Sequence, residues 1–210
     1  MFTYTKPLLA VLLLTVALFY FSSGTASAAD TTFAQTSGGQ NQNSIYREVP
    51  VTLNGGFEIG QNDYGRPVAL IASMLGVTPD IFRQAFSGVT PAKIGAPSEA
   101  QAQANKSALL KVLSRYGVTN EKLDQVANYY RFNKRKGQTW PHTKAAAIAI
   151  VENGQITGVK ITTPGSGYSS LPSVAISGFP NVKASASISY STDFKTNGSI
   201  SAITLAQSGN

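Results

Sequence analysis

The sequence predicts an α+β protein: a small N-terminal helical bundle followed by a C-terminal antiparallel β unit with an internal duplication. Apolar residues recur every three or four positions between residues 66 and 136, and they alternate with polar ones from residue 145 to 210. Similar segments also recur within the alternating part. We therefore divide the chain into a leader (1–28), a flexible linker with a short extended segment (29–65), the helical bundle (66–136) and the β domain (145–210).

The first residues have the pattern of a cleavable secretory signal. Lys6 precedes an apolar run of about 14 residues, Leu8 to Phe21, and Ala26-Ser27-Ala28 fits the small-x-small cleavage rule. A membrane-spanning helix needs about 20 apolar residues, so this run is short for one. We expect cleavage near Ala28 and a mature chain that is secreted or periplasmic, without a membrane span. An uncleaved N-terminal membrane anchor is the alternative.

The chain has no cysteine and a net charge of +7. Without cysteine it can form neither disulfides nor thiolate metal sites, so burial alone has to stabilise the fold. Removal of the leader leaves 16 basic against 10 acidic residues, a net charge near +6. This charge permits contact with anionic polymers or lipid headgroups. The chain lacks the concentrated stripe of basic residues and the recognisable module of a nucleic-acid-binding protein, so we expect no nucleic-acid partner.

The first two helices are marked by residues that favour helix ends. Pro67 suits a first helical position, and Gly76 suits the left-handed residue that follows a helix. The segment Thr78-Pro79-Asp80 begins the next helix, because it supplies an N-cap, a proline for the first turn and a negative charge. Ser87-Gly88 ends this second helix.

Two further helices follow a loop that contains proline and glycine. Ser98 and Gln101 form a capping-box pattern at the start of the third helix, and Gly117 ends it. The fourth helix carries Leu123 and Val126 on one face. All four helices are too short or too plain to persist alone in water, so we expect their apolar faces to pack against one another.

Alternating apolar residues from Ala145 onward predict antiparallel strands. The turn signals Glu152-Asn153-Gly154 and Thr196-Asn197-Gly198 separate the runs, and an Asn-Gly pair between strands favours a hairpin turn. An extra five-residue piece around Asp193-Phe194-Lys195 enlarges the second of these hairpins.

The alternating part also repeats itself. Residues 154–161 line up with residues 198–205 at an offset of 44. This indicates two degenerate repeats, 145–178 and 183–210. Two copies are a duplication rather than a solenoid, which usually needs three or more.

The most distinctive stretch is Thr163-Pro164-Gly165-Ser166-Gly167-Tyr168, followed by Leu171-Pro172-Ser173-Val174. It resembles the PGSGY-type β repeat of phage tail-associated and bacterial surface proteins, over about residues 145–178 and more weakly over the second copy. The resemblance implies a β module and no particular activity. A phosphate loop would need a helix after the glycines, and another strand follows instead. We interpret the following residues as a structural turn motif: Pro164, Gly165, Gly167, Tyr168 and Pro172.

A basic run at the end of the helical part lies beside aromatic residues. Rings and cations together can stack on sugars or hold phosphates. The candidate ligand-binding residues are Tyr129, Arg131, Lys134, Arg135 and Trp140. The alternative is that Tyr130 is a core residue, that the cations favour a helix C-terminus, and that Trp140 fills the junction between the domains. The segments Asn128-Tyr129-Tyr130-Arg131 and Trp140-Pro141 also resemble an uncharacterised family of exported bacterial proteins.

Residue types that catalyse reactions or bind metals form no recognisable cluster. His142 is the only histidine, and it has no cysteine or second histidine with which to bind zinc. No serine has an activating sequence context. The acidic residues are scattered, and several stand in helix first turns, where capping explains them. We therefore expect no catalytic residue, no metal and no cofactor.

These features favour a non-enzymatic binding or interaction module of the bacterial cell envelope. Its partner would be an envelope polymer or protein, and the ligand and the oligomeric state stay open. One alternative is a structural or assembly component that pairs with a neighbour through its β edges. The other is a small hydrolase that uses His142 and a carboxylate.

Overall fold

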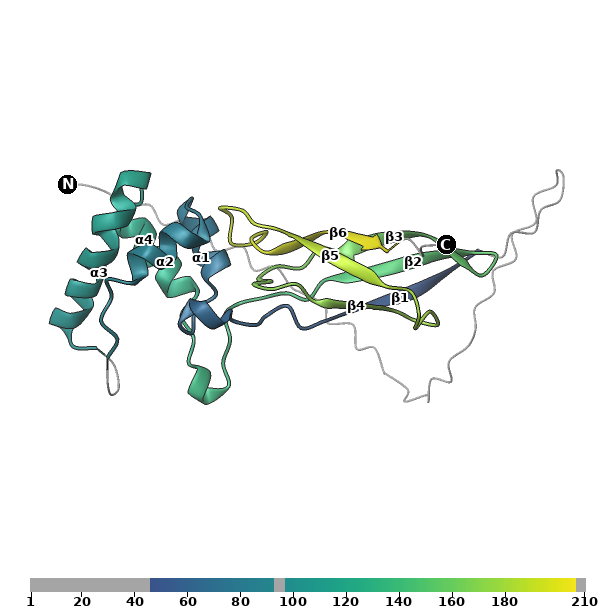
Figure 1. Ribbon diagram of the computed structural model, residues 1–210, viewed down its shortest axis with the longest axis horizontal. Helices are drawn as coiled ribbons and strands as arrows, with labels where there is room; N and C mark the ends of the chain where they lie inside the picture. The colour runs from purple at the N-terminus through teal and green to yellow at the C-terminus, as the bar shows by residue number, and fades with distance from the viewer. Residues whose placement is uncertain (1–45, 93–96, 207–210) are drawn as a thin grey trace, which may run out of the picture. The chain divides into compact units, whose positions relative to one another are not determined.

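A computed structural model describes residues 46–92 and 97–206, which belong to one compact unit, Asn43–Asn210 (Figure 1). The predicted leader and most of the predicted linker lie outside the described residues. In the described part, four α-helices accompany a six-stranded antiparallel sheet, so the predicted α+β class is confirmed. No described helix combines the length and the hydrophobicity needed to cross a bilayer.

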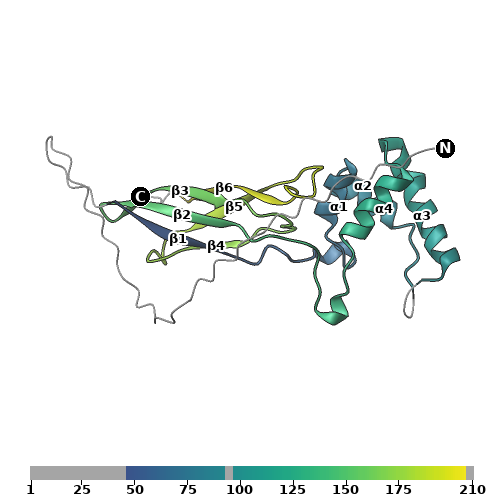
Figure 2. The ribbon, with the colours of Figure 1, turned by 180° about the vertical axis from the view of Figure 1, so that it is seen from behind.

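The strands form one antiparallel sheet in the order β3-β2-β1-β4-β5-β6. Figure 2 shows β1, β2 and β3 from behind, with β1 beside β2. The outermost strands β3 and β6 lie against each other, so the sheet is nearly closed. The strands span Tyr46–Asn54 (β1), Ala146–Glu152 (β2), Gln155–Thr163 (β3), Ser173–Ile176 (β4), Ala184–Ser189 (β5) and Ser199–Leu205 (β6).

Strand β1 lies in the middle of the sheet, although it precedes all the helices in the sequence. Val51 stands opposite Ala147 of β2 on one side and Ile176 of β4 on the other. The helices therefore interrupt the chain between two neighbouring strands. The sheet therefore includes a strand that starts at Tyr46. The sequence had placed the whole β unit after Ala145. Pro50 lies within β1 and cannot donate to a ladder. Its carbonyl accepts a hydrogen bond from Ser177 N at 3.1 Å.

The two Asn-Gly turns differ from each other. Asn153 and Gly154 have φ of 50° and 81° and join β2 to β3 directly, as predicted. Asn197-Gly198 instead closes a longer connection, residues 190–198, between β5 and β6. This longer connection contains Asp193-Phe194-Lys195, as predicted. The Asn197 side chain is buried against the helices.

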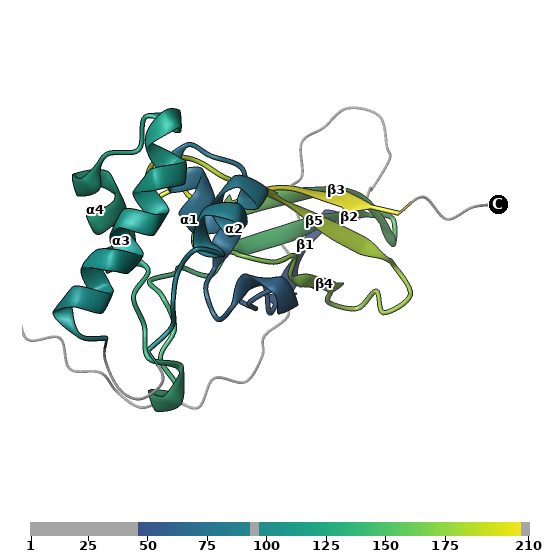
Figure 3. The same cartoon turned by 60° about the vertical axis from the view of Figure 1, so that its left-hand side comes forward.

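The helices span Val68–Leu75 (α1), Pro79–Phe86 (α2), Glu99–Leu113 (α3) and Asn120–Tyr129 (α4) (Figure 3). Three helices have an N-cap residue whose side-chain oxygen accepts a hydrogen bond from the main-chain N–H three residues later. These N-caps are Thr78, Ser98 and Thr119. The capping box at Ser98 is only half made, because the Gln101 amide donates to the carbonyls of Thr90 and Pro91 instead.

The helical part and the sheet have different interiors. The helices surround a core of large side chains, among them Leu70, Met74, Phe82, Leu113 and Trp140. Small side chains occupy much of the buried face of the sheet, among them Val49, Val51, Ala147, Ala149 and Val151. A third cluster around Tyr168, Ala186 and Ile200 lies near the Gly-rich turn.

Candidate functional site

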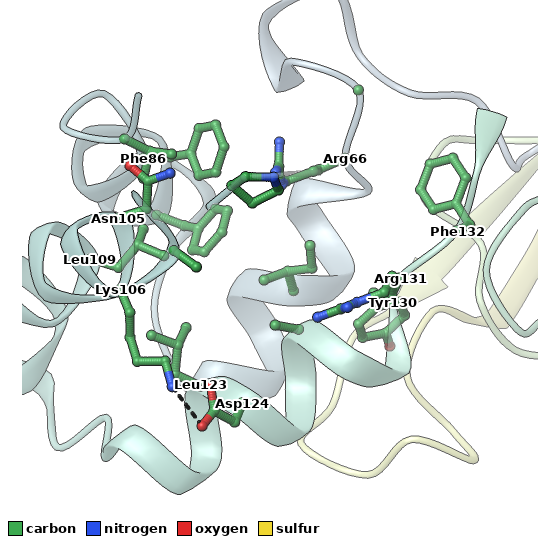
Figure 4. A pocket seen from close by; sticks show the side chains of 17 residues that line it. Arg66, Phe86, Asn105, Lys106, Leu109, Leu123, Asp124, Tyr130, Arg131 and Phe132 are labelled. Atoms are coloured by element: carbon green, nitrogen blue, oxygen red, sulfur yellow. Dashed lines mark hydrogen bonds and ion pairs between the residues drawn. The ribbon is translucent and has the colours of Figure 1, made fainter. Parts of the chain in front are cut away.

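A pocket of about 510 Å³ lies among the helices and the segments that flank them (Figure 4). This volume falls within the range of roughly 300 to 1,000 Å³ that is usual for small-molecule sites. All four α-helices contribute residues to its lining. The apolar part of the lining includes Ile71, Phe82, Phe86, Leu109, Leu123 and Phe132.

Two arginines border the pocket from opposite ends of the helical part of the chain. The Arg66 guanidinium lies 4.1 Å from the centroid of the Phe86 ring, and its Nη1 donates a long hydrogen bond of 3.4 Å to Tyr64 O. Partial burial lowers the pKa of Arg66, although the residue keeps substantial contact with solvent, and its charge remains at neutral pH. Arg131 Nη2 donates to Asn128 Oδ1 at 3.1 Å. In the described ranges, neither arginine forms an ion pair with a carboxylate.

The other charged residues of the lining neutralise each other. Lys106 Nζ on α3 lies 2.8 Å from the Asp124 carboxylate on α4, as the dashed line in Figure 4 marks. Asn105, one position earlier, is held by Thr90, because its side chain accepts from Thr90 N and donates to Thr90 O, both at 2.8 Å. The free positive charge of the lining therefore resides on Arg66 and Arg131.

Tyr130 forms part of the pocket wall and connects it to the sheet. Its hydroxyl accepts a hydrogen bond of 2.9 Å from Asn197 Nδ2. Burial raises the pKa of Tyr130 to about 12, although the Asn197 hydrogen bond acts in the opposite direction. The phenol is therefore neutral at physiological pH.

Asn197 is the most constrained polar residue in the described part of the chain. It is fully buried, and its Nδ2 also donates to Leu70 O at 2.9 Å. Its Oδ1 accepts from Ser73 Oγ at 2.8 Å and from Ser191 N at 3.1 Å. This one side chain thus joins α1, the end of α4 and the connection between β5 and β6. The Asn-Gly signal correctly placed Asn197 in the turn before β6, but it gave no indication that the side chain is buried.

The five candidate binding residues do not form one surface. Tyr129 is half-buried with its ring 4.1 Å from Phe194, and Lys134 is exposed in a short 3-10 helix. The side chain of Arg135 is outside the part of the structure that is described. Of the four whose side chains are described, Arg131 lines the pocket and Tyr129, Lys134 and Trp140 do not.

Trp140 is a structural residue. It is 2% exposed, and its Nε1 donates to Gly167 O at 2.8 Å. Its ring meets Phe132 edge-on at 5.5 Å between centroids. A buried indole cannot stack on a ligand from solution, so we remove Trp140 from the candidate set. This is the alternative role, at a junction, that the sequence left open.

The Gly-rich turn motif packs against main-chain atoms. Tyr168 is 1% exposed, and its hydroxyl accepts from Ala145 N at 2.8 Å while its ring stacks on Phe57 at 4.5 Å. Gly165 and Gly167 have φ of 64° and 82°. A Cβ on Gly167 would lie 2.7 Å from the Cβ of His142, so no larger residue fits without a shift. Pro172 is also buried. These contacts agree with a structural role for the motif.

The contacts of the His142 ring differ from those of a catalytic base. Its Nδ1 lies 2.9 Å from Trp140 O, and its ring lies 4.2 Å from Phe57. Across residues 46–92 and 97–206, its ring has no serine or carboxylate as a hydrogen-bond partner. A hydrogen bond from Ser170 Oγ lowers the pKa of Glu58, but this pair lacks a histidine. The described residues also contain no cluster of three or more metal-binding side chains.

Comparison of the chain with models of protein families, with curated proteins and with solved structures finds no match. Function is therefore inferred from the site itself. The features that define the site are an apolar pocket, two arginines without acidic partners and a rigid wall at Tyr130.

Proposed function

We propose that this chain is an exported, non-enzymatic binding module of the bacterial cell envelope that holds its ligand in the pocket among the helices. The observation that supports this is the combination of an apolar lining with Arg66 and Arg131 at its border. Ligand sites are usually apolar concavities with a few convergent polar groups, and this pocket has that composition. The predicted leader over residues 1–28 supports export.

The proposal includes the finer organisation of the fold. The helices act as a bundle around the core that contains Leu70 and Leu113, and the β unit arose by duplication. The duplication is supported by the places of two hairpins in the sheet, since β2–β3 and β5–β6 flank the central pair β1 and β4. The similar segments 154–161 and 198–205 begin at β3 and β6, respectively.

Pairing through β edges receives less support than ligand binding. The outermost strands β3 and β6 lie against each other, so a neighbouring chain has less free edge to extend than an open sheet would provide. The hydrolase alternative needs a base beside a nucleophile, and His142 contacts Phe57 and a main-chain carbonyl instead.

The test is co-sedimentation of the purified mature chain with bacterial envelope fractions. Ala127 lines the pocket and is exposed, so Ala127→Phe should fill the pocket without disturbing the core. Ala104→Phe is the matched control, because Ala104 is exposed on α3 and does not line the pocket. We expect the wild type and Ala104→Phe to sediment with envelopes and Ala127→Phe to stay in solution. Equal behaviour of the two variants would contradict a role for the pocket.

Export is tested separately by fractionation and mass measurement. The proposal expects a chain that begins near Ala29 outside the cytoplasm. Recovery of the uncleaved protein in the cytosol would contradict it.

A further inference from the structure

We propose that the ligand of the pocket is a single-chain amphiphile: one acyl chain that carries an anionic head group, either a carboxylate or a phosphate. This inference rests on the proposed function and specifies its ligand. The acyl chain occupies the apolar part of the pocket, and Arg66 and Arg131 bind the head group.

The apolar part suits one chain. Ile71, Phe82, Leu109 and Leu123 come from four different helices, so each helix contributes hydrocarbon to one space of about 510 Å³. Burial of apolar surface would supply most of the binding free energy, because it removes a hydrocarbon chain from water. A soluble sugar or a multiply charged polymer would leave these side chains without a partner.

The charge at the border selects an anion. Arg66 and Arg131 have no carboxylate partner in the described chain, whereas Lys106 is already paired with Asp124. Guanidinium groups bind carboxylate and phosphate oxygens through two parallel N–H donors, a geometry that lysine cannot offer. In Figure 4, Arg131 extends from the end of α4 toward the pocket, and Arg66 lies beside Phe86.

Arg66 is held in place before any ligand arrives. Tyr64 and Gly65 both have positive φ, 48° and 79°, and a left-handed conformation is uncommon for a residue as large as tyrosine. The turn is anchored because Arg66 N donates to Asp63 O at 3.0 Å while the Asp63 side chain pairs with Arg83 at 2.8 Å. The guanidinium carbon of Arg66 lies over the Phe86 ring. Apart from the long Nη1 bond to Tyr64 O, its N–H donors are available to an anion.

Binding can be followed with the natural fluorophore. Trp140 is the only tryptophan, and its ring contacts Phe132, which lines the pocket. The probes are dodecanoate, dodecyl phosphate, dodecyl maltoside and dodecyltrimethylammonium, each below its micellar concentration. They share one chain length and differ in the head group. We expect the two anionic probes to bind at least about tenfold more tightly than the neutral and cationic ones, as an interaction of about 1.4 kcal/mol would give.

Chain length and charge are then varied independently. Each methylene added to the alkyl carboxylate should tighten binding about fourfold until the pocket is full. Arg66→Gln and Arg131→Gln should each weaken anion binding about tenfold and leave dodecyl maltoside unchanged. Lys111→Gln removes the same charge from an exposed position outside the lining and should change neither. Equal affinity for all four head groups, or an equal loss in Lys111→Gln, would overturn the proposal.

The failure of this inference is distinguishable from failure of the proposed function. If no amphiphile binds while Ala127→Phe still abolishes envelope binding, the pocket is functional and this ligand class is wrong. If amphiphiles bind and envelope sedimentation is absent, the ligand class stands and the envelope role is wrong. A wild-type dimer that Ala127→Phe dissociates, together with no amphiphile binding, would assign the pocket to a second copy and overturn the inference.

Discussion

The helical part and the sheet fill their interiors in opposite ways. The helices bury large side chains such as Leu113, Met74 and Trp140, while the buried side of β2 presents Ala147, Ala149 and Val151. Helices that cross one another leave irregular spaces that long side chains can fill. A nearly closed sheet of six strands leaves a narrow interior in which small residues fit. Only the helical part encloses the pocket, so packing by long side chains is also what provides room for a ligand.

The junction between the two regions is polar at its centre. Asn197 satisfies main-chain and side-chain groups from α1, from the end of α4 and from the connection that precedes β6. A buried amide with all its partners has a strict geometry, so it fixes how the sheet connection meets the helices. The comparison therefore teaches that the two regions bury different kinds of side chain, and that Asn197 is the polar centre of the contacts that join them.

The largest expected effect comes from breaking that junction. Asn197→Ala removes a hydrogen bond from each of Tyr130 Oη, Leu70 O, Ser73 Oγ and Ser191 N, although Ser73 Oγ still donates to Leu70 O. We expect a loss of about 4 kcal/mol in the free energy of unfolding, measured by chemical denaturation. Asn181→Ala, in the exposed loop between β4 and β5, is the control and should cost less than about 0.5 kcal/mol. Similar losses for both variants would show that the two regions are not joined through Asn197.

The next two substitutions test the difference in packing between the helical interior and the interior of the sheet. Leu113 is fully buried among the helices, and Leu113→Ala should cost about 3 kcal/mol because it creates a cavity. Ala149 is fully buried in β2, and Ala149→Leu should cost about 2 kcal/mol because the interior of the sheet has no room for the larger side chain. Both values come from denaturant unfolding. If Ala149→Leu were as stable as the wild type, the sheet would contain spare volume and the contrast would be lost.

The smallest effect appears only at high pH and concerns Tyr130. Burial raises its pKa from 10.0 to about 12, so the unfolded chain loses the phenolic proton before the folded chain does. The stabilising effect of the neutral phenol is present below pH 10 and is lost as the pH rises toward about 12, by about 2 kcal/mol.

Tyr130→Phe abolishes this titration, so the difference in unfolding free energy between wild type and variant should change across that interval. Tyr116→Phe, at an exposed position, should retain the wild-type pH dependence. A constant difference between wild type and Tyr130→Phe from pH 9 to pH 12 would contradict the assignment of the titration to Tyr130.

The correct predictions from sequence concern features that neighbouring residues determine. Thr78 and Ser98 cap helices as predicted, and Asn153-Gly154 forms the predicted turn, because both kinds of feature depend on a few successive residues. Arg131 was also identified as a candidate binding residue and does line the pocket. Export and the repeat resemblance stay predictions.

The remaining site residues gave no local signal. Arg66 directly precedes Pro67, and Phe82 and Leu109 follow the apolar period of the predicted helices, so nothing in the sequence marks them as site residues. Their convergence depends on the packing of α1, α2, α3 and α4, whose contacts are separated by long stretches of chain. Trp140 was a candidate binding residue with a junction role as the alternative, and it is buried. The sequence left both roles open, because an aromatic residue beside a basic run has the same pattern in either environment.

By itself, the sequence determined the starts of α2, α3 and α4 and the β2–β3 turn, since capping and turn chemistry act over a few residues. It missed two ends by a few residues, because Pro67 caps α1 instead of beginning it and Gly117 follows a 3-10 helix after α3. Tertiary structure alone decided that β1 lies at the centre of the sheet, with partners near residues 150 and 175. It also decided that Asn197 is a buried junction and that Arg66 and Arg131 border one pocket. These outcomes depend on which distant surfaces bury one another, and that free energy is gained only once the whole chain has folded.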